Sequence, residues 1–220
     1  MTIEPIGYFS CAFKRKFGIP RQSGLIPDLS GKVVLKKEWS DVEGLRGLDS
    51  FDYIWLLWGF SNNRHKASGS TVRPPLLGGN QRMGVFATRS PYRPSPLGLS
   101  SVRMQEIKRN VDGLLEIHVL GADLQDRTPI YDIKPYLEYS DSHPGVRCGF
   151  VDNYRWERLE VEFTKAALGR YTPEEIKLIG DILELDPRPH YQDKPDKTYG
   201  MEFGDKDIHF RIADGRCLVL

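Results

Sequence analysis

Two arginines stand in a short, proline-rich stretch near the middle of the chain. Residues 84–100 read GVFATRSPYRPSPLGLS, and three prolines surround Arg89 and Arg93. Each proline fixes its own φ and disfavours helix at the preceding residue, so both arginines sit on a stiff, non-helical backbone. A guanidinium offers a planar fork of donors to a carboxylate or phosphate and can stack on a base. The stretch therefore fits a preorganised polar site, although an ordinary turn with solvated arginines explains the same composition.

Three other loops carry polar side chains that could face a ligand. Residues 20–24 read PRQSG, within a long loop over residues 13–29. Residues 123–136 read DLQDRTPIYDIKPY, of which residues 123–129 form a polar loop. His65 and Lys66 lie in a third loop, residues 61–82, which is rich in Asn, Gly, Ser and Pro. A loop of that length inside a compact domain is usually functional or disordered. Solvated surface loops are the alternative explanation in each case.

The stretches 20–24, 84–100 and 123–136, in this order and spacing, resemble the signatures of the TsaA-like family. Members of that family are S-adenosylmethionine-dependent methyltransferases that modify N6-threonylcarbamoyladenosine in tRNA. The resemblance runs from about Ile3 to the C-terminus. It implies S-adenosyl-L-methionine as cofactor, tRNA as partner, a β-barrel-like fold with a small C-terminal domain, and a homodimer with its site near the interface.

The same resemblance implies a cofactor site built from loop residues rather than from a glycine-rich fingerprint. The residues carried over are Pro20, Arg21, Gln22, His65, Lys66, Arg89, Leu99, Asp126, Arg127, Thr128 and Pro129. They include donors for the carboxylate of the cofactor and acceptors for its ammonium group, ribose and adenine.

Methyl transfer from a sulfonium is an in-line displacement, so the protein mainly positions the acceptor and manages charge. The acceptor nitrogen loses a proton, and a base would assist that loss. Asp126 and Asp132 are the nearest candidates, and proton loss to water without a base stays open. The threonine carboxylate of the modified adenosine could pair with Arg93 or Lys134.

The charge balance gives no global attraction to nucleic acid, because the formal net charge is +1. Any RNA contact must then come from a local patch. Residues 186–197 read DPRPHYQDKPDK and place Arg188, Tyr191 and Lys194 on a proline-stiffened loop. An aromatic among cations suits a single-stranded RNA loop, and a charged linker is the alternative.

Cysteine content and hydropathy narrow the class of protein. The three cysteines are odd in number and widely spaced, which predicts neither a disulfide framework nor a metal site. No apolar run reaches membrane-spanning length and no signal-peptide pattern opens the chain. We expect a cytoplasmic protein without a membrane or metal partner.

The hydrophobic pattern predicts a mostly β protein. Strand patterns cover residues 3–11, 31–39, 83–88, 99–108, 114–120 and 130–136. The apolar run 51–60 reads as a strand buried on both faces, and residues 41–48 as one or two helical turns with Asp41 as N-cap. No G-x-G-x-x-G follows a strand and strands do not alternate with helices, so a Rossmann-type fold is excluded.

A helix-plus-strands unit is predicted at the C-terminal end. Thr172, Pro173 and Glu175 form a capping box with proline at the first helical position, and strand patterns follow over 199–203, 207–213 and 216–220. We therefore predict a β-barrel-like cofactor-binding domain over 1–165 and a small α+β domain over 166–220 that contacts tRNA.

Three functions are compatible with these features. A tRNA methyltransferase is favoured by the resemblance. A non-catalytic RNA- or metabolite-binding barrel would use the same rigid loop, and a methyltransferase acting on a small metabolite would use the same cofactor site.

Overall fold

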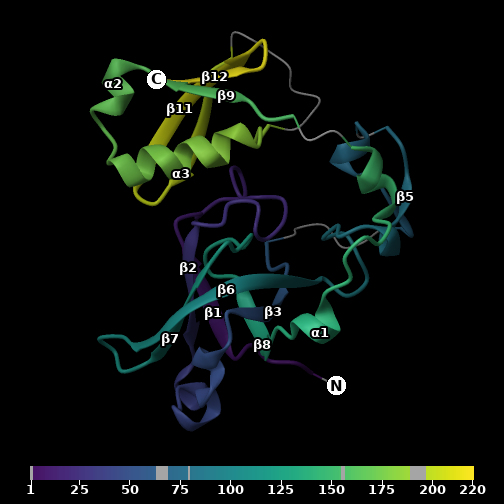
Figure 1. Cartoon of the computed structure of the whole chain (residues 1–220), viewed down its shortest axis with the longest axis vertical. Coiled ribbons are helices and arrows are strands. Elements are labelled where there is room, and N and C mark those ends of the chain that lie inside the picture. Colours follow the sequence, from purple (N-terminus) through teal and green to yellow (C-terminus); the bar gives the residue numbers. More distant parts are fainter. Residues whose placement is uncertain (1, 63–68, 79, 155–156, 189–196) are drawn as a thin grey trace.

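The computed structural model describes residues 2–62, 69–78, 80–154, 157–188 and 197–220. Within these ranges the chain forms a closed six-stranded barrel and a four-stranded sheet that carries the two helices of the C-terminal part (Figure 1). A two-stranded sheet lies in a lobe beside the barrel. The prediction of a mostly β protein with a barrel, and without a Rossmann fold, is confirmed.

The barrel is antiparallel at every pairing of its described strands. The strands are β1 (Gly7–Cys11), β2 (Ser30–Leu35), β3 (Tyr53–Gly59), β6 (Leu97–Arg109), β7 (Leu115–Leu120) and β8 (Pro129–Pro135), in the order β1-β2-β7-β6-β3-β8. Phe9, Ile54, Leu56, Ile117 and Ile130 fill the interior, each at most 2% exposed. Closure of the sheet removes open strand edges and leaves one inside and one outside face.

Strand β3 corrects one expectation. Its apolar run predicted a strand buried on both faces, yet the large side chains that are buried are Ile54, Leu56 and Trp58, whereas Trp55 and Leu57 are partly exposed on the outer face. Alternate side chains of a strand point to opposite faces, and the barrel has a single interior. The outer apolar side chains therefore do not belong to the barrel core, and they line the cleft described below.

Short 3₁₀ turns replace several of the predicted elements. The turns η1 (Lys37–Trp39), η2 (Glu43–Leu45) and η3 (Leu48–Ser50) join β2 to β3, so the predicted strand over 31–39 ends at Leu35. The one or two helical turns predicted over 41–48 correspond to η2 and the start of η3. The N-cap of η2 is Val42 and not Asp41, although Asp41 Oδ1 accepts from the backbone N–H of Glu43.

The lobe beside the barrel is also built from short pieces. It holds β4 (Thr71–Val72), η4 (Pro75–Leu77), β5 (Met83–Gly84) and η5 (Val85–Ala87), and α1 (Glu138–Asp141) and η6 (Gly149–Asn153) follow β8. The predicted strand over 83–88 is correct only for its first two residues. The chain turns there because Thr88 donates both its N–H and its hydroxyl to the carbonyl of Val85.

The C-terminal part is a sheet covered by a helix. The elements are β9 (Glu160–Phe163), α2 (Lys165–Leu168), α3 (Pro173–Glu184), β10 (Tyr199–Phe203), β11 (Lys206–Ala213) and β12 (Arg216–Val219), with the sheet order β10-β11-β12-β9. The capping box at Thr172 and the last three strands are confirmed. Strand β9 was not predicted. It lies before the predicted boundary at 165/166 but pairs in parallel with β12 in this sheet.

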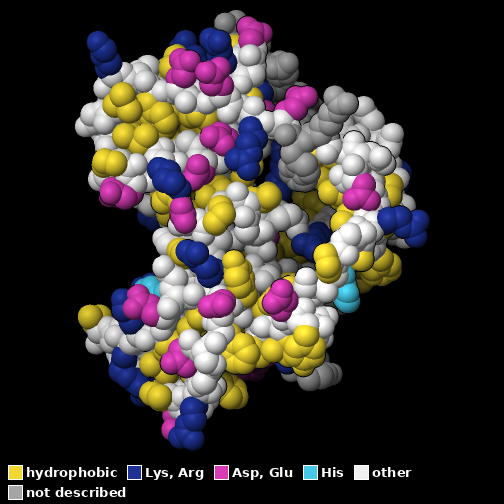
Figure 2. All heavy atoms as spheres, in the orientation of Figure 1, with side chains coloured by type: hydrophobic (Ala, Val, Ile, Leu, Met, Phe, Trp, Pro, Cys, Tyr) yellow, Lys and Arg dark blue, Asp and Glu magenta, His cyan; other side chains and the backbone are white. Residues whose placement is uncertain are grey.

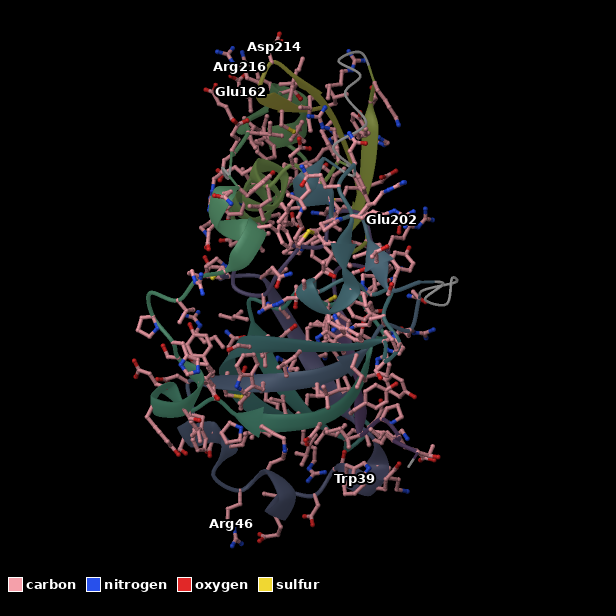
Figure 3. The ribbon with its side chains drawn as sticks, turned by 90° about the vertical axis from the view of Figure 1, so that its right-hand side faces the viewer. Trp39, Arg46, Glu162, Glu202, Asp214 and Arg216 are labelled. Atoms are coloured by element: carbon pink, nitrogen blue, oxygen red, sulfur yellow. The ribbon has the colours of Figure 1, made fainter. Side chains whose placement is uncertain are left out.

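The loop over residues 13–29 connects the barrel to the C-terminal sheet. Phe13, Ile26 and Leu29, each at most 4% exposed, belong to the same core cluster as Phe210 of β11. Arg15 adds an ion pair of 3.0 Å to Glu202. Figure 3 labels Glu202 at the level where the two parts meet. The loop predicted from sequence is therefore correct, but its apolar residues form part of a second core.

Three further observations concern cysteines, metals and membranes. Cys11, Cys148 and Cys217 are free thiols. Across the described ranges, no three side chains of His, Cys, Asp or Glu gather as metal ligands would. None of the helices described there combines the length and apolarity that crossing a bilayer requires.

Candidate functional site

A cleft of about 610 Å³ opens at the end of the barrel where β3 finishes and β6 begins. Its polar lining consists of Arg21, Gln22, Arg89, Arg93, Ser95 and Asp123. Its apolar wall includes Trp55, Leu57, Trp58, Phe60, Leu97 and Leu99. Figure 2 shows the surface hollowed between the body of the molecule and the lobe that carries β5, with hydrophobic side chains inside the hollow. The outer face of β3 thus lines a cleft instead of packing under a second layer.

The cleft brings together predicted residues that are far apart in the chain. Pro20, Arg21 and Gln22 from the loop after β1 meet Arg89 from the proline-rich loop and Leu99 from β6. Arg89 Nη1 donates to Gln22 Oε1, which joins the two loops directly. Five of the residues that the resemblance assigns to the cofactor therefore share one cleft.

Arg93 lines the same cleft. Its Nη1 donates to the carbonyl of Thr88 at 3.0 Å, which fixes the guanidinium on its own loop while the side chain stays partly exposed. The carbonyl is neutral, so the positive charge of Arg93 remains available to an anion. The sequence prediction that Arg93 meets a substrate carboxylate fits this position.

Two glycines fasten the loop after β1 to the segment that follows β7. Gly24 donates to the carbonyl of Gly121 at 2.8 Å, and Gly121 donates to the carbonyl of Leu29 at 2.8 Å. Both glycines have positive φ, +80° and +78°, which side-chain-bearing residues rarely adopt. These bonds place residues 20–22 beside Asp123.

Asp123 is the site residue that the sequence reasoning did not select. Its Oδ1 accepts from the Ser100 hydroxyl at 2.6 Å, and Ser100 Oγ in turn accepts from the Trp58 indole N–H at 2.9 Å. Burial raises the pKa of the Asp123 carboxyl, while the Ser100 hydrogen bond and the charge of Arg89 oppose that rise. An acid directly after the small residues Gly121 and Ala122, at the end of a buried strand, was the signal available in the sequence.

The segment from Asp126 to Pro129 does not line the cleft. Asp126 Oδ1 accepts from the backbone N–H of Cys11 at 3.2 Å, and the carbonyl of Thr128 accepts from Phe9 N at 2.8 Å. Arg127 is exposed with a φ of +63°. In this chain the segment holds the end of β1, and its predicted contact with the cofactor stays a prediction.

Asp132 and Lys134 lie on β8 next to the cleft wall. Their side chains form an ion pair of 3.0 Å. In the barrel register Asp132 stands opposite Leu57, and Lys134 opposite Trp55. Directly opposite residues of antiparallel strands share a face, so this pair sits on the outer surface beside the cleft. Neither residue is part of the cleft lining, and their roles as base and substrate ligand remain predictions.

Arg188 is committed to a structural contact. Its Nε and Nη2 both reach the Asp186 carboxylate at 2.9 Å, and its side chain is only 12% exposed. The hydrogen bond to Asp186 raises the pKa of Arg188 against the opposing effect of burial. Arg21 Nη2 donates to the backbone carbonyl of the same Asp186 at 3.1 Å. His65, Lys66, Tyr191 and Lys194 lie outside the described residues, and the RNA contact of this segment stays a prediction.

Comparison with known proteins identifies the family. A family model described as the tRNA-methyltransferase O N-terminal domain matches residues 8–142, and one described as the TrmO C-terminal domain matches residues 156–220. The chain belongs to the TrmO family.

Relatives and solved structures of the TrmO family match nearly the whole chain. A tRNA (adenine(37)-N6)-methyltransferase of Escherichia coli K12 is 35% identical, over 96% of this chain and 93% of that protein. A putative S-adenosylmethionine-dependent methyltransferase RcsF of Pseudomonas aeruginosa is 36% identical, over 95% of this chain and 91% of that protein. A crystal structure of TrmO from Pseudomonas aeruginosa has a TM-score of 0.78 at 30% identity and covers 100% of this chain and 97% of that one.

The residues that line the cleft come from one of the two TrmO matches. All the lining residues lie within the N-terminal match over 8–142. The C-terminal match contributes the Asp186 carbonyl that Arg21 reaches. In this TrmO chain the cleft is therefore built by the barrel and braced from the C-terminal sheet.

Proposed function

We propose that this TrmO chain transfers the methyl group of S-adenosyl-L-methionine to N6 of adenine 37 in tRNA, on the adenosine that carries a threonylcarbamoyl group. The observation that carries the proposal is the convergence of residues 20–22, Arg89 and Leu99 on one cleft. The names of the relatives from Escherichia coli and Pseudomonas aeruginosa support the reaction and the cofactor.

The cleft has the chemistry that this cofactor requires. S-adenosyl-L-methionine supplies an electrophilic methyl group on a sulfonium, and it also carries a carboxylate, an ammonium and an adenine. Arg21 and Arg89 offer donors to the carboxylate. The Trp55, Trp58 and Phe60 side chains offer an apolar wall to an adenine ring. The cleft volume of about 610 Å³ lies in the usual range for small-molecule sites.

Arg93 recognises the threonine carboxylate of the substrate in this proposal. It lines the cleft, whereas Lys134 is engaged with Asp132 on the surface beside it. We expect Arg93→Ala to lower methylation of threonylcarbamoylated tRNA more than tenfold and to leave the trace activity on unmodified tRNA unchanged, because only the first substrate offers a carboxylate. Equal losses on both tRNAs, measured by nucleoside mass spectrometry, would contradict this role.

The remaining expectations belong to the same proposal. Lys194 and Tyr191 contact the tRNA, His65 and Lys66 contact the cofactor, and the protein works as a cytoplasmic homodimer. Exposed apolar side chains support a dimer, since Leu99 in the cleft lining is 55% exposed and Phe86 of η5 is 78% exposed. Light scattering of the purified chain measures the assembly, and a monomer at micromolar concentration would contradict it.

The test of the function compares Arg89→Ala with Arg46→Ala. Arg46 is an exposed arginine paired with Glu43, and Figure 3 shows it at the end of the molecule far from the C-terminal sheet. A lost charge-assisted bond to the cofactor is worth about 1.5–3 kcal/mol, or roughly 10- to 150-fold in affinity. We expect that loss in calorimetry with S-adenosyl-L-methionine for Arg89→Ala, and no loss for Arg46→Ala.

Both variants should keep the melting midpoint of the wild type, because exposed arginines contribute little to the core. Mass spectrometry of threonylcarbamoylated tRNA after incubation with cofactor detects the product. Wild-type protein that binds no cofactor would favour a non-catalytic barrel, and protein that binds cofactor but leaves tRNA unmethylated would favour a small-metabolite substrate.

A further inference from the structure

Asp123 is the one acidic side chain among the described residues that line the cleft. The other polar side chains there are arginines, an amide and a hydroxyl, which are not proton acceptors at neutral pH. Asp126 is bonded to Cys11 N at the end of β1, and Asp132 is paired with Lys134 outside the cleft. Asp123 therefore lines the cleft, whereas Asp126 and Asp132, the two candidate bases from the sequence, do not.

A directed chain of hydrogen bonds holds the Asp123 carboxylate. The Trp58 indole is a donor only, so Ser100 Oγ must accept from it at 2.9 Å. The single hydroxyl hydrogen of Ser100 is then free to point at Asp123 Oδ1, 2.6 Å away. Ser100 is 1% exposed and Trp58 8% exposed, so the chain is shielded from water and the carboxylate has a fixed position.

The Trp58 ring is itself held by the strand beside it. A Cβ at Gly98 would stand 2.3 Å from the indole, so the absence of a side chain on Gly98 lets the ring lie against the backbone. Phe60 packs edge-on against the same ring at 4.4 Å between centroids. The indole that starts the hydrogen-bond chain is therefore closely packed on two sides.

The charges facing Asp123 come from the two loops of the cleft. Arg89 is the cation whose field reaches the carboxylate, and Arg21 and Arg93 line the same cleft. Burial nevertheless outweighs Ser100 and Arg89, so the pKa of Asp123 is raised. A carboxylate with a raised pKa is a better proton acceptor than an exposed one.

We propose that Asp123 is a catalytic residue that accepts the N6 proton of the acceptor adenosine, with Ser100 and Trp58 as positioning residues. This inference rests on the proposed function. One methyl group leaves sulfur for N6 with the C–S electron pair remaining on sulfur, N6 gives up its one proton, and the Asp123 carboxylate takes that proton and passes it to water. The N6 lone pair is weakly basic beside the carbamoyl group, so removal of the proton favours attack.

The first test uses Asp123→Asn in the full chain with threonylcarbamoylated tRNA. Loss of a general base typically costs 10²- to 10⁴-fold, so we expect kcat to fall at least about 100-fold. The Kd for S-adenosyl-L-methionine, measured by calorimetry, should change less than about threefold. A matching loss of cofactor affinity would make Asp123 a cofactor ligand and overturn the inference, as would an unchanged kcat. Wild-type protein without activity on this tRNA would instead contradict the proposed function.

The second test uses Ser100→Ala and the pH dependence of kcat. The Ser100 hydroxyl stabilises the charged form of Asp123, so its removal should move the acid limb of the profile to higher pH. A uniform fall in kcat with an unmoved acid limb would mean that Ser100 serves the fold alone, and would overturn its positioning role. Ser101→Ala, on the same strand but outside the cleft lining, is the matched control and should keep the wild-type profile.

Discussion

At the scale of single residues, the position of Asp123 suits the proposed base, but burial of its carboxylate lowers the stability of the fold. Burial raises its pKa, so the folded chain favours the protonated form. Stability from this group is fully present below the ordinary carboxyl pKa and is lost as pH rises through the raised value. Stability of the fold alone would therefore not favour a buried acid at this position.

Asp123→Asn removes the free-energy cost of burying an ionised carboxylate, so the variant should be more stable than the wild type. The gain in free energy of unfolding of the variant over wild type should be larger at pH 8 than at pH 4, because rising pH favours the ionised form of Asp123, which burial penalises, and asparagine has no ionised form. Urea denaturation at the two pH values measures the difference. A gain that shrinks with rising pH would contradict the direction of the pKa shift.

Residue motifs predicted one half of the cleft and missed the other half. Arg89 and residues 20–22 were found because the strings that contain them carry the family resemblance. Asp123 could not be separated from Asp126 by sequence, since both lie in one polar loop. The choice depends on the Gly24–Gly121 contact, which joins two segments that four barrel strands separate in the chain.

At the scale of elements, helix α3 begins with a closed pair of caps. Thr172 Oγ1 accepts from Glu175 N at 3.3 Å, and Glu175 Oε2 accepts from Thr172 N at 2.8 Å. The side-chain bond to Lys206 of β11 and the backbone bond to Thr172 lower the pKa of Glu175. The first turn of the helix is therefore tied to the sheet that it covers.

Thr172→Ala should lower the free energy of unfolding by about 1 kcal/mol, within a range of roughly 0.5–2 kcal/mol for lost N-caps. Thr172→Ser keeps the hydroxyl and should recover most of it. Chemical denaturation of both variants makes the measurement. An alanine variant as stable as the serine variant would show that the cap contributes nothing here.

Elements with local signals were predictable, and elements with distant partners were not. The capped helix α3 and the strands β10 to β12 follow from patterns within a few residues. Strand β9 is short and pairs in parallel with β12, which lies at the other end of the C-terminal part. The outer face of β3 was misread because an apolar cleft wall and a buried face have the same composition.

At the scale of the whole molecule, two cores share one loop. Residues 13–29 leave the barrel, bury Phe13 and Ile26 among the residues of the C-terminal sheet, and return to β2. The same loop presents residues 20–22 to the cleft. The domain pattern in the sequence could indicate two units, but not that the first lends side chains to the core of the second.

Phe13→Ala should therefore have two effects. Deleting a fully buried phenylalanine costs about 3–5 kcal/mol of unfolding free energy. Because the loop loses its anchor, affinity for S-adenosyl-L-methionine should also fall, measured by calorimetry well below the melting midpoint. Ile117→Ala, in the barrel core, is the control that destabilises without touching the loop. Equal cofactor affinity in both variants would show that the loop needs no such anchor.

The position of Phe13 also sets an order of events during synthesis. Phe13 packs edge-on against Phe203 at 5.4 Å between centroids, and these residues stand near opposite ends of the chain. Arg21 and Gln22 of the loop leave the ribosome early. Phe203, against which Phe13 packs, is among the last residues translated. Since domains tend to fold as units while the chain grows, the barrel can close first on the nascent chain. The apolar side chains of the loop over residues 13–29 then stay uncovered until the C-terminal strands have been translated.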